Sequence, residues 1–239
     1  HTGTRLPRGS APITFGSWMG GDRDGNPNVT AEVTRQVVFL GRWIAADLYW
    51  REIDALRAEL PLADGSVELK RAAGGQPEPY RVVLGEVRAL LARTRDWTAA
   101  ELDEGVQPSR GEVLLTANQL QEPLELVWRS LVETGLDCVA EGRLLDLLRR
   151  IDVFGVALAK LDIRQEAERH SSLLDAITSW LGLGHYTRWP EAQRQSWLLE
   201  QLAANRPLLS QRQCPDLAPE DQAVLDTFWA MADLPPESL

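Results

Sequence analysis

The chain has 239 residues, enough for one large domain or two small ones with a buried core. Its 44% hydrophobic and 25% charged residues are those of a soluble globular protein, and its net charge of −10 argues against nucleic acid or an anionic membrane as a partner. No apolar run approaches the roughly 18 residues of a membrane span, and Cys138 and Cys214 lack the spacing of a metal or disulfide pattern, so we expect a reducing, cytoplasmic location.

Helical periodicity runs through most of the chain after an arm, residues 1–11, that shows little pattern. Thr30 is placed to cap the first and longest helix, and prolines stand at the predicted starts of three others. One weak helical turn is expected within 64–77. Apolar residues at helical spacing predict the main helices over 30–60, 79–102, 117–135, 144–152, 173–181, 190–203 and 219–233.

Residues 156–164 differ, because a short apolar run follows Gly155 and leads into a fresh helix near Glu166. This pattern predicts a buried strand that feeds a helix, as in α/β architecture. Side chains alternate along a strand, so Lys160, Asp162 and Arg164 share one face. Two interpretations stay open for these charges. They form an internal salt-bridge network, or Arg164 binds a phosphate at the carboxyl end of a barrel strand.

A glycine-rich segment, residues 15–28, precedes the longest helix and combines four glycines with Asp22, Arg23, Asp24 and Asn26. It is not a calcium loop, which needs glycine at its sixth position and glutamate at its twelfth. No Gly-Lys-Ser/Thr follows, so it is not a phosphate loop. It is either a functional loop or a structural strand-to-helix turn held by Asp–Arg pairing.

Four motifs carry a resemblance to a known family. They are Ser-Trp-Met-Gly-Gly-Asp-Arg-Asp-Gly-Asn-Pro at 17–27, Glu-Pro-Tyr-Arg at 78–81, Leu-Asp-Ile-Arg-Gln-Glu at 161–166 and Trp-Pro-Glu at 189–191. Together they resemble the phosphoenolpyruvate carboxylases, over nearly the whole chain. Members of that family are several times longer, so residues 1–239 resemble a single internal segment of such an enzyme.

The resemblance implies a fold that is mainly α with a few β-strands, part of a β/α barrel surrounded by many helices. Barrel strands are expected near 12–18 and 156–164, within a helical body over 12–239. The family joins bicarbonate to phosphoenolpyruvate with Mg²⁺ or Mn²⁺, giving oxaloacetate and phosphate, and assembles as a homotetramer. These properties are therefore expected of the full-length protein.

Residue by residue, the resemblance implies that Arg164 grips the substrate phosphate and Trp18 lines the apolar pocket near the methylene carbon. Arg81 matches an arginine of a sugar-phosphate activator site. The surrounding polar residues of the loop and strand are expected to support the pocket: Asp22, Arg23, Asp24, Asn26 and Asp162.

The chain also departs from the family pattern. The Thr-Ala-His-Pro-Thr motif with the catalytic histidine is absent, as are the metal-binding carboxylates and the glycine-rich mobile loop. We therefore expect no catalytic residue and no metal ligand in this segment, and no activity from it alone. The alternative is a non-catalytic helical regulatory or assembly module derived from the fold, which binding of phosphoenolpyruvate or a sugar phosphate would distinguish from a partial site.

Overall fold

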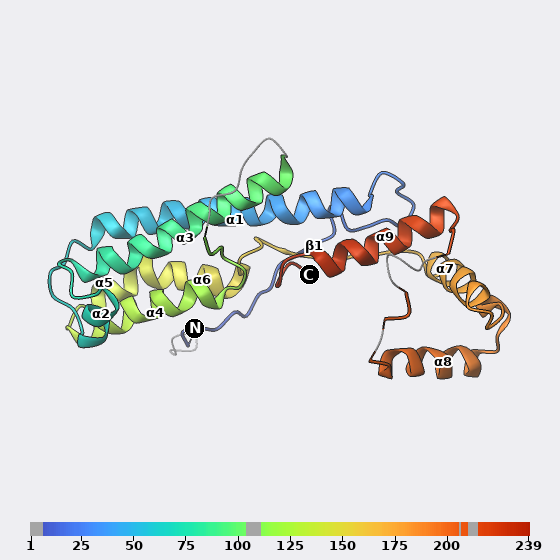
Figure 1. Cartoon of the computed structure of the whole chain (residues 1–239). Coiled ribbons are helices and arrows are strands. Elements are labelled where there is room, and N and C mark those ends of the chain that lie inside the picture. Colours follow the sequence, from blue (N-terminus) through green and yellow to red (C-terminus); the bar gives the residue numbers. More distant parts are fainter. Residues whose placement is uncertain (1–6, 104–110, 206, 210–214) are drawn as a thin grey trace. The chain divides into compact units, whose positions relative to one another are not determined.

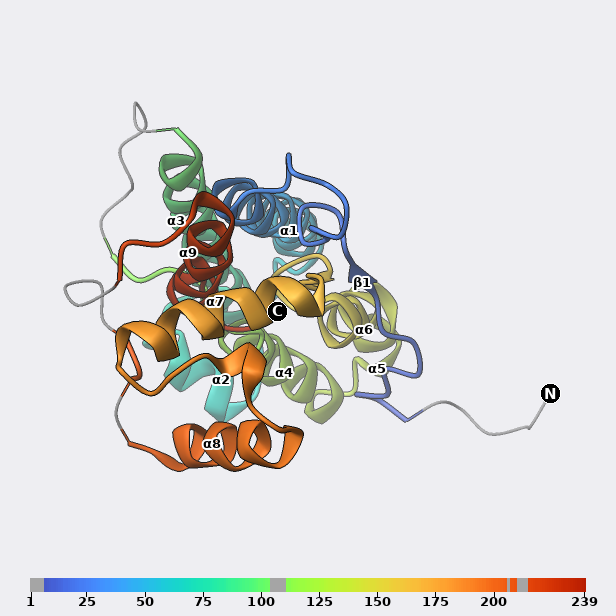
Figure 2. The same ribbon diagram turned by 90° about the vertical axis from the view of Figure 1, so that its right-hand side faces the viewer.

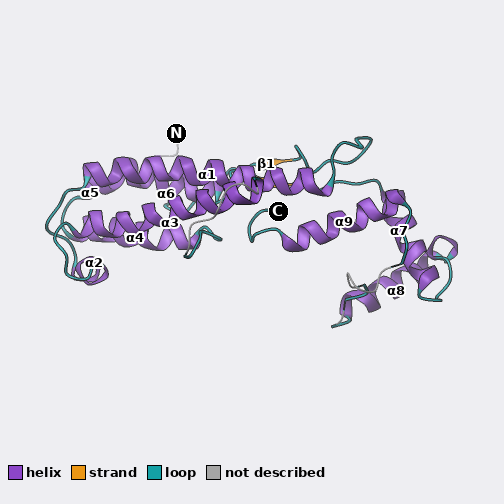
Figure 3. Ribbon diagram, turned by 45° about the horizontal axis from the view of Figure 1, so that its top comes forward, coloured by secondary structure: helices purple, strands orange, loops and turns teal. Residues whose placement is uncertain are grey.

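The computed structural model describes residues 7–103, 111–205, 207–209 and 215–239, so Cys214 and part of the expected arm lie outside it. Helices predominate, accompanied by two short parallel strands, which confirms the predicted fold class (Figures 1 and 3). By its internal contacts the chain divides into two compact units. The first unit comprises residues 1–19, 35–162 and 234–239, and the second comprises 20–34 and 163–233.

The first unit is a bundle in which α1, α3, α4 and α6 surround a common core (Figure 2). Leucine, isoleucine and valine side chains fill this core, and many are fully buried. The periodicity located its main helices correctly. Their bounds are α1 Ala31–Glu59, whose first turn belongs to the second unit, α2 Val67–Ala72, α3 Pro79–Leu102, α4 Asn118–Glu133, α5 Asp137–Val139, the π-helical turn η1 Ala140–Leu144 and α6 Leu145–Phe154.

The two strands, β1 Gly16–Ser17 and β2 Lys160–Leu161, pair in parallel and are shorter than the sequence predicts. Residues 156–159 turn instead of extending, because the Ala159 N–H bonds to the Ala157 carbonyl at 2.8 Å and Leu158 adopts a φ of 66°. Backbone groups used in a local turn are not available to a sheet ladder.

Strand β2 has neighbours on both sides. The Asp162 N–H donates to the Ser17 carbonyl at 2.7 Å, and the preceding Leu161 N–H donates to the Ser238 carbonyl at 3.1 Å. Successive N–H groups of a strand point to opposite sides. The segment ending in Ser238 therefore flanks β2 on the side opposite β1, although the two segments lie far apart in sequence.

Arg42 on α1 ties three segments of the first unit together from a position that is only 1% exposed. One nitrogen, Nη1, donates to the Pro236 carbonyl at 2.9 Å and the Ser238 hydroxyl at 3.4 Å. The other, Nη2, donates to the carbonyls of Leu115 at 2.6 Å and Leu114 at 3.4 Å. Burial lowers the pKa of Arg42 to about 10, which still leaves it charged at neutral pH. Arg42 therefore fixes the flank of β2.

Helices α1 and α3 run alongside each other (Figures 1 and 2) and meet along a charged seam, defined by Asp47, Asp54, Arg88 and Arg95. Arg88 Nε lies 2.7 Å from Asp54 Oδ1, and Arg95 Nη1 lies 3.1 Å from Asp47 Oδ1. Both guanidinium groups also cover the ring of Trp50, at 4.4 and 5.3 Å from its centre. The cation–π contacts add to the ion pairs.

A buried tie joins the start of α3 to α4. The hydroxyl groups of Tyr80 and Ser130 lie 2.8 Å apart, and both residues are 0% exposed. Ser130 Oγ also accepts a hydrogen bond from the Ser66 N–H at 2.8 Å. Gly65 packs closely beside them, since a Cβ there would lie 3.3 Å from both Ser130 Oγ and the Tyr80 ring and would push these neighbours slightly apart.

The second unit contains residues 20–28 of the glycine-rich segment and a smaller set of helices around a core of Leu173, Ile177, Val224 and Leu225. One of its helices, α8, buries none of its residues fully. Trp197 of that helix stacks edge-on against Trp189 at 5.7 Å. The predicted helices are confirmed, with bounds α7 Ala167–Trp180, the 3₁₀ turn η2 Tyr186–Arg188, α8 Glu191–Ala203 and α9 Pro219–Asp233.

We predict that Arg42→Met lowers the free energy of unfolding of the first unit by about 3 kcal/mol, because buried carbonyl groups lose a charged donor. Urea unfolding followed by circular dichroism measures the loss. Arg57→Met is the control, since Arg57 makes only a 3.4 Å bond to the Arg81 carbonyl and a 3.9 Å ion pair with Asp54. Similar losses in both variants would contradict a special role for Arg42.

Candidate functional site

The glycine-rich loop and the Leu-Asp-Ile-Arg-Gln-Glu motif meet within the second unit. Asp22 and Arg164 form an isolated parallel bridge. The Arg164 N–H donates to the Gly21 carbonyl at 2.9 Å, and the Arg23 N–H donates to the Arg164 carbonyl at 3.0 Å. The backbone of Arg164 is therefore held on both sides by the loop, while its side chain is exposed.

Two of the predicted supporting residues shape the loop through side-chain-to-backbone bonds. Asp22 Oδ1 accepts from the Asp24 N–H at 3.3 Å, and Asn26 Oδ1 accepts from the Asn28 N–H at 3.1 Å. Such bonds stabilise tight turns. Gly25 between them has a φ of 65°, which favours glycine. Asp22 and Asn26 thus set the path of the loop, and Asp24 is exposed on it.

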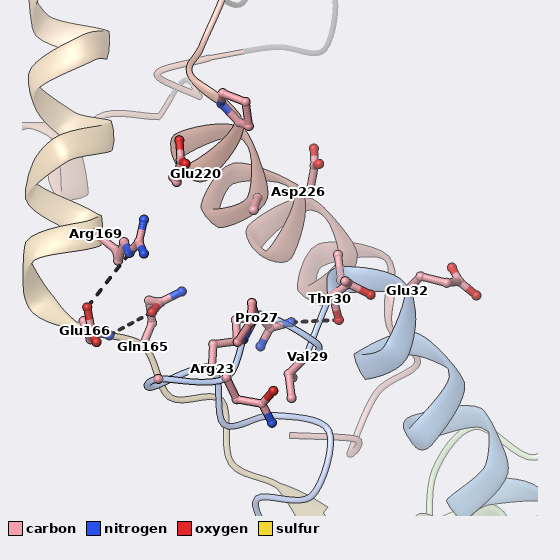
Figure 4. A pocket seen from close by; sticks show the side chains of 15 residues that line it. Arg23, Pro27, Val29, Thr30, Glu32, Gln165, Glu166, Arg169, Glu220 and Asp226 are labelled. Carbon is pink, nitrogen blue, oxygen red and sulfur yellow. Dashed lines mark hydrogen bonds and ion pairs between the residues drawn. The ribbon is translucent and has the colours of Figure 1, made fainter.

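Arg23 braces the loop from inside and is only 8% exposed. Its Nη1 donates to the Gly21 carbonyl at 3.2 Å, and its Nη2 donates to the Thr30 carbonyl at 3.3 Å and to Thr34 Oγ1 at 2.5 Å (Figure 4 shows the bond to Thr30). Thr34 Oγ1 in turn donates a hydrogen bond to the Gly20 carbonyl at 2.6 Å. Burial lowers the pKa of Arg23. The Asp–Arg pairing considered for this loop is therefore not what holds it.

A groove of about 880 Å³ opens beside the braced loop (Figure 4). Helices α1, α7 and α9 all begin at its rim, and acidic side chains lie near each start. Carboxylates at these positions complement the positive ends of helices. The charged lining consists of Arg23, Glu32, Glu166, Arg169, Glu220 and Asp226.

The first unit holds the other predicted pocket residues. Trp18 follows β1 and is 57% exposed, and Asp162 follows β2 and is also exposed. The bond from the Asp162 N–H to the Ser17 carbonyl brings the ends of these strands together. Exposed Lys160 and Asp162 and buried Leu161 follow the predicted alternation, with the charges on the open face instead of inside the protein.

Arg81 lies apart from these residues, in the first turn of α3. Its Nη1 is 3.2 Å from Glu78 Oε2, and its carbonyl accepts a hydrogen bond from Arg57 Nε. A shallow groove of about 480 Å³ runs past both arginines. Glu78, which precedes the helix, has a φ of 56° and so adopts the left-handed conformation.

Thr34, Gln165 and Arg169 belong to the site although the sequence did not predict them there. Thr34 is fully buried on α1. The feature of the sequence that could have identified it is a hydroxyl side chain on the inward face of the predicted helix, four residues after the capping Thr30. Gln165 and Arg169 line the groove. Gln165 stands next to Arg164 in a motif already singled out, whereas Arg169 lies beyond that motif, on the helix that follows it.

Two further observations concern metal sites and membrane-spanning helices among the described residues. In the ranges that the structure covers, no three His, Cys, Asp or Glu side chains gather as a metal site. The same ranges contain no helix both long and apolar enough to cross a membrane.

These features define a mainly helical protein in which short parallel strands end in a glycine-rich loop and a charged motif. A family model described as phosphoenolpyruvate carboxylase matches residues 1–238. The chain is 51% identical over 230 residues to a phosphoenolpyruvate carboxylase of Chromohalobacter salexigens, covering 96% of this chain and 26% of that protein. Proteins of the same name from Hahella chejuensis and Stutzerimonas stutzeri are 48% and 49% identical, over 99% and 100% of this chain and 27% of each relative.

The chain belongs to the phosphoenolpyruvate carboxylase family. It spans about a quarter of the length of the relatives it matches. The resemblance drawn from the four sequence motifs is therefore confirmed at the level of the family.

We predict that Thr34→Val loosens the loop, because Arg23 loses an acceptor and the Gly20 carbonyl loses a donor. The free energy of unfolding of the second unit should fall by about 1–2 kcal/mol. Amide hydrogen exchange in residues 20–34 should accelerate, while exchange in α8 should not. Thr34→Ser keeps the hydroxyl and serves as the control. Unchanged exchange in the valine variant would show that the brace does not depend on Thr34.

Proposed function

We propose that the protein to which this chain contributes joins bicarbonate to phosphoenolpyruvate, giving oxaloacetate and phosphate. Membership of the family supports this activity. The observation that carries the proposal is the backbone pairing of Gly21, Asp22 and Arg23 with Arg164. Through this pairing, two signature motifs that are distant in sequence form one local structure.

Arg164 is proposed to bind the phosphate group of phosphoenolpyruvate. A guanidinium offers a permanently charged, planar donor fork that suits phosphate oxygens. The backbone bonds to Gly21 and Arg23 fix where this side chain begins, and its exposure leaves it accessible to a ligand. Asp22, Arg23 and Asn26 support it indirectly by shaping the loop.

Trp18 is proposed to form the apolar wall near the methylene carbon of the substrate. A tryptophan that served only as core packing would be largely buried, whereas Trp18 is 57% exposed. Asp162 lies near it, because its N–H bonds to the carbonyl of Ser17, the residue before Trp18. Asp162 is proposed to support this part of the pocket, and Asp24 to support the loop.

The remaining parts of the reaction are proposed to come from outside this segment. These are the catalytic histidine and the carboxylates that would hold Mg²⁺ or Mn²⁺, an ion that would supply positive charge to the reaction. The described acidic residues form no cluster that fits such an ion. We propose a cytoplasmic homotetramer for the full-length protein and no turnover by this chain alone.

Arg81 is proposed to bind the phosphate of a sugar-phosphate activator. It lines a shallow groove together with Arg57, so two guanidinium groups border one open surface. Glu78 and Glu86 also line this groove. An activator phosphate would therefore have to compete with Glu78 for the Arg81 side chain.

Arg164→Lys in the full-length enzyme should lower kcat/KM for phosphoenolpyruvate by the equivalent of about 1.5–3 kcal/mol, since the donor fork is lost. Bicarbonate affinity at saturating phosphoenolpyruvate should change less. Arg129→Lys is the matched control, because Arg129 is an exposed arginine on α4 that pairs with Glu68 at 3.1 Å. Unchanged constants for Arg164→Lys would support the salt-bridge interpretation of this strand.

Trp18→Ala in the full-length enzyme should reduce turnover much more than stability. Removing a buried core aromatic typically costs about 3–5 kcal/mol in folding, and the exposure of Trp18 predicts a far smaller loss. Steady-state kinetics and thermal unfolding on the same samples test this. A large fall in stability with normal turnover would identify Trp18 as a packing residue.

Arg81→Ala in the full-length enzyme should weaken activation by glucose 6-phosphate and leave the rate without activator nearly unchanged. Arg129→Ala is the control, because Arg129 forms a comparable exposed ion pair, with Glu68 at 3.1 Å. Activation curves measured at subsaturating phosphoenolpyruvate give the comparison. Identical curves for the Arg81 variant and the parent would limit Arg81 to a role at the start of α3.

A further inference from the structure

A second, smaller cavity in the second unit has a volume of about 170 Å³. One part of its wall is polar and the rest is mostly apolar. The polar part consists of Arg23, Gln165 and His170. The rest of the wall consists of Ile163, Val224, Thr227, Phe228 and Met231. The proposed reaction gives this cavity no role.

Arg23 brings a buried positive charge to this cavity without a negative partner. Its three bonds go to two carbonyls and a hydroxyl, which are neutral, and they use three of the five guanidinium N–H groups. Within the described ranges no carboxylate forms an ion pair with it. Burial lowers its pKa and no carboxylate offsets that effect. A buried charge is costly unless it is paired, so this site favours an anion.

Two neutral side chains complete the polar wall. The Gln165 amide oxygen accepts the Glu166 N–H at 3.0 Å, which leaves the amide NH₂ group as a donor. The His170 ring is half-buried and packs 5.7 Å from the Phe228 ring. Imidazole supplies a further N–H donor. With one permanent cation, this donor set matches a monoanion better than a doubly charged phosphate.

The apolar wall limits the class of ligand further. Val224, Phe228 and Met231 offer no hydrogen bonds but suit a methyl or short alkyl group. We infer that this cavity binds a short monocarboxylate of the acetate type, with its carboxylate toward Arg23 and its alkyl group toward α9. The inference does not depend on the proposed carboxylation reaction, because it uses only the chemistry of this cavity.

Isothermal titration of sodium acetate into the protein tests the inference. His170→Phe keeps the ring against Phe228 but removes the donor, and Gln165→Met keeps the length of the side chain without its amide. Each should weaken acetate binding about tenfold, as expected for the loss of a hydrogen bond to a charged group. Both spare the Arg23 brace, so the loop should stay folded. Arg169→Met, which alters the larger groove only, should bind acetate like the parent.

Bicarbonate and inorganic phosphate, titrated in parallel, test the ligand class. Acetate should bind more tightly than bicarbonate, which lacks the alkyl group, and more tightly than phosphate. Three results would overturn the inference: no acetate binding by the parent, equal binding by the parent and both cavity variants, or tighter binding of bicarbonate or phosphate than of acetate.

Discussion

Both units depend on a buried arginine that bonds to backbone carbonyl groups. Arg42 holds residues 114–115 and 236–238 to α1 in the first unit, and Arg23 holds residues 21–34 in the second. Segments without regular structure leave carbonyl groups unpaired, and a buried carbonyl needs a donor. One guanidinium supplies up to five. These arginines thus allow irregular chain to pack against helices without unsatisfied acceptors.

Within the motif at residues 17–27, Arg23 holds the loop in shape, and other residues of the motif are proposed to form the substrate pocket. Arg23 uses three of its five N–H groups to brace the loop and has no direct part in the proposed carboxylation, so that chemistry rests on its neighbours. Arg164 presents the reverse arrangement, because its backbone is fixed by the loop while its side chain is exposed. A charged residue in a signature motif can therefore brace the loop or present its side chain at the surface, and its burial and hydrogen-bond partners distinguish the two arrangements.

Periodicity predicted the helices well because each has an apolar stripe long enough to register at helical spacing. The strand over 156–164 was predicted too long. The backbone hydrogen bond between Ala157 and Ala159 that limits it cannot be recognised from the pattern of apolar residues. The partner of Arg23 was not predictable either. Asp22 and Asp24 flank Arg23 in the sequence and were the obvious candidates for its partner. Its actual side-chain partner is Thr34, which lies on α1 and is brought near Arg23 by the fold. The motifs identified the family, but the division into two units arises from contacts that the sequence pattern does not contain.

The charged seam between α1 and α3 repeats every seven residues on both helices, with Asp47 and Asp54 facing Arg95 and Arg88. Arg81 continues the arginine series by the same interval. Sliding α3 by one interval, about 10 Å, would place Arg81 and Arg88 opposite the same two aspartates. Electrostatics alone would thus accept two alignments of these helices. The Tyr80–Ser130 tie is more specific, because a single buried hydroxyl meets a single partner, so an uncharged pair sets the position of α3 along α4.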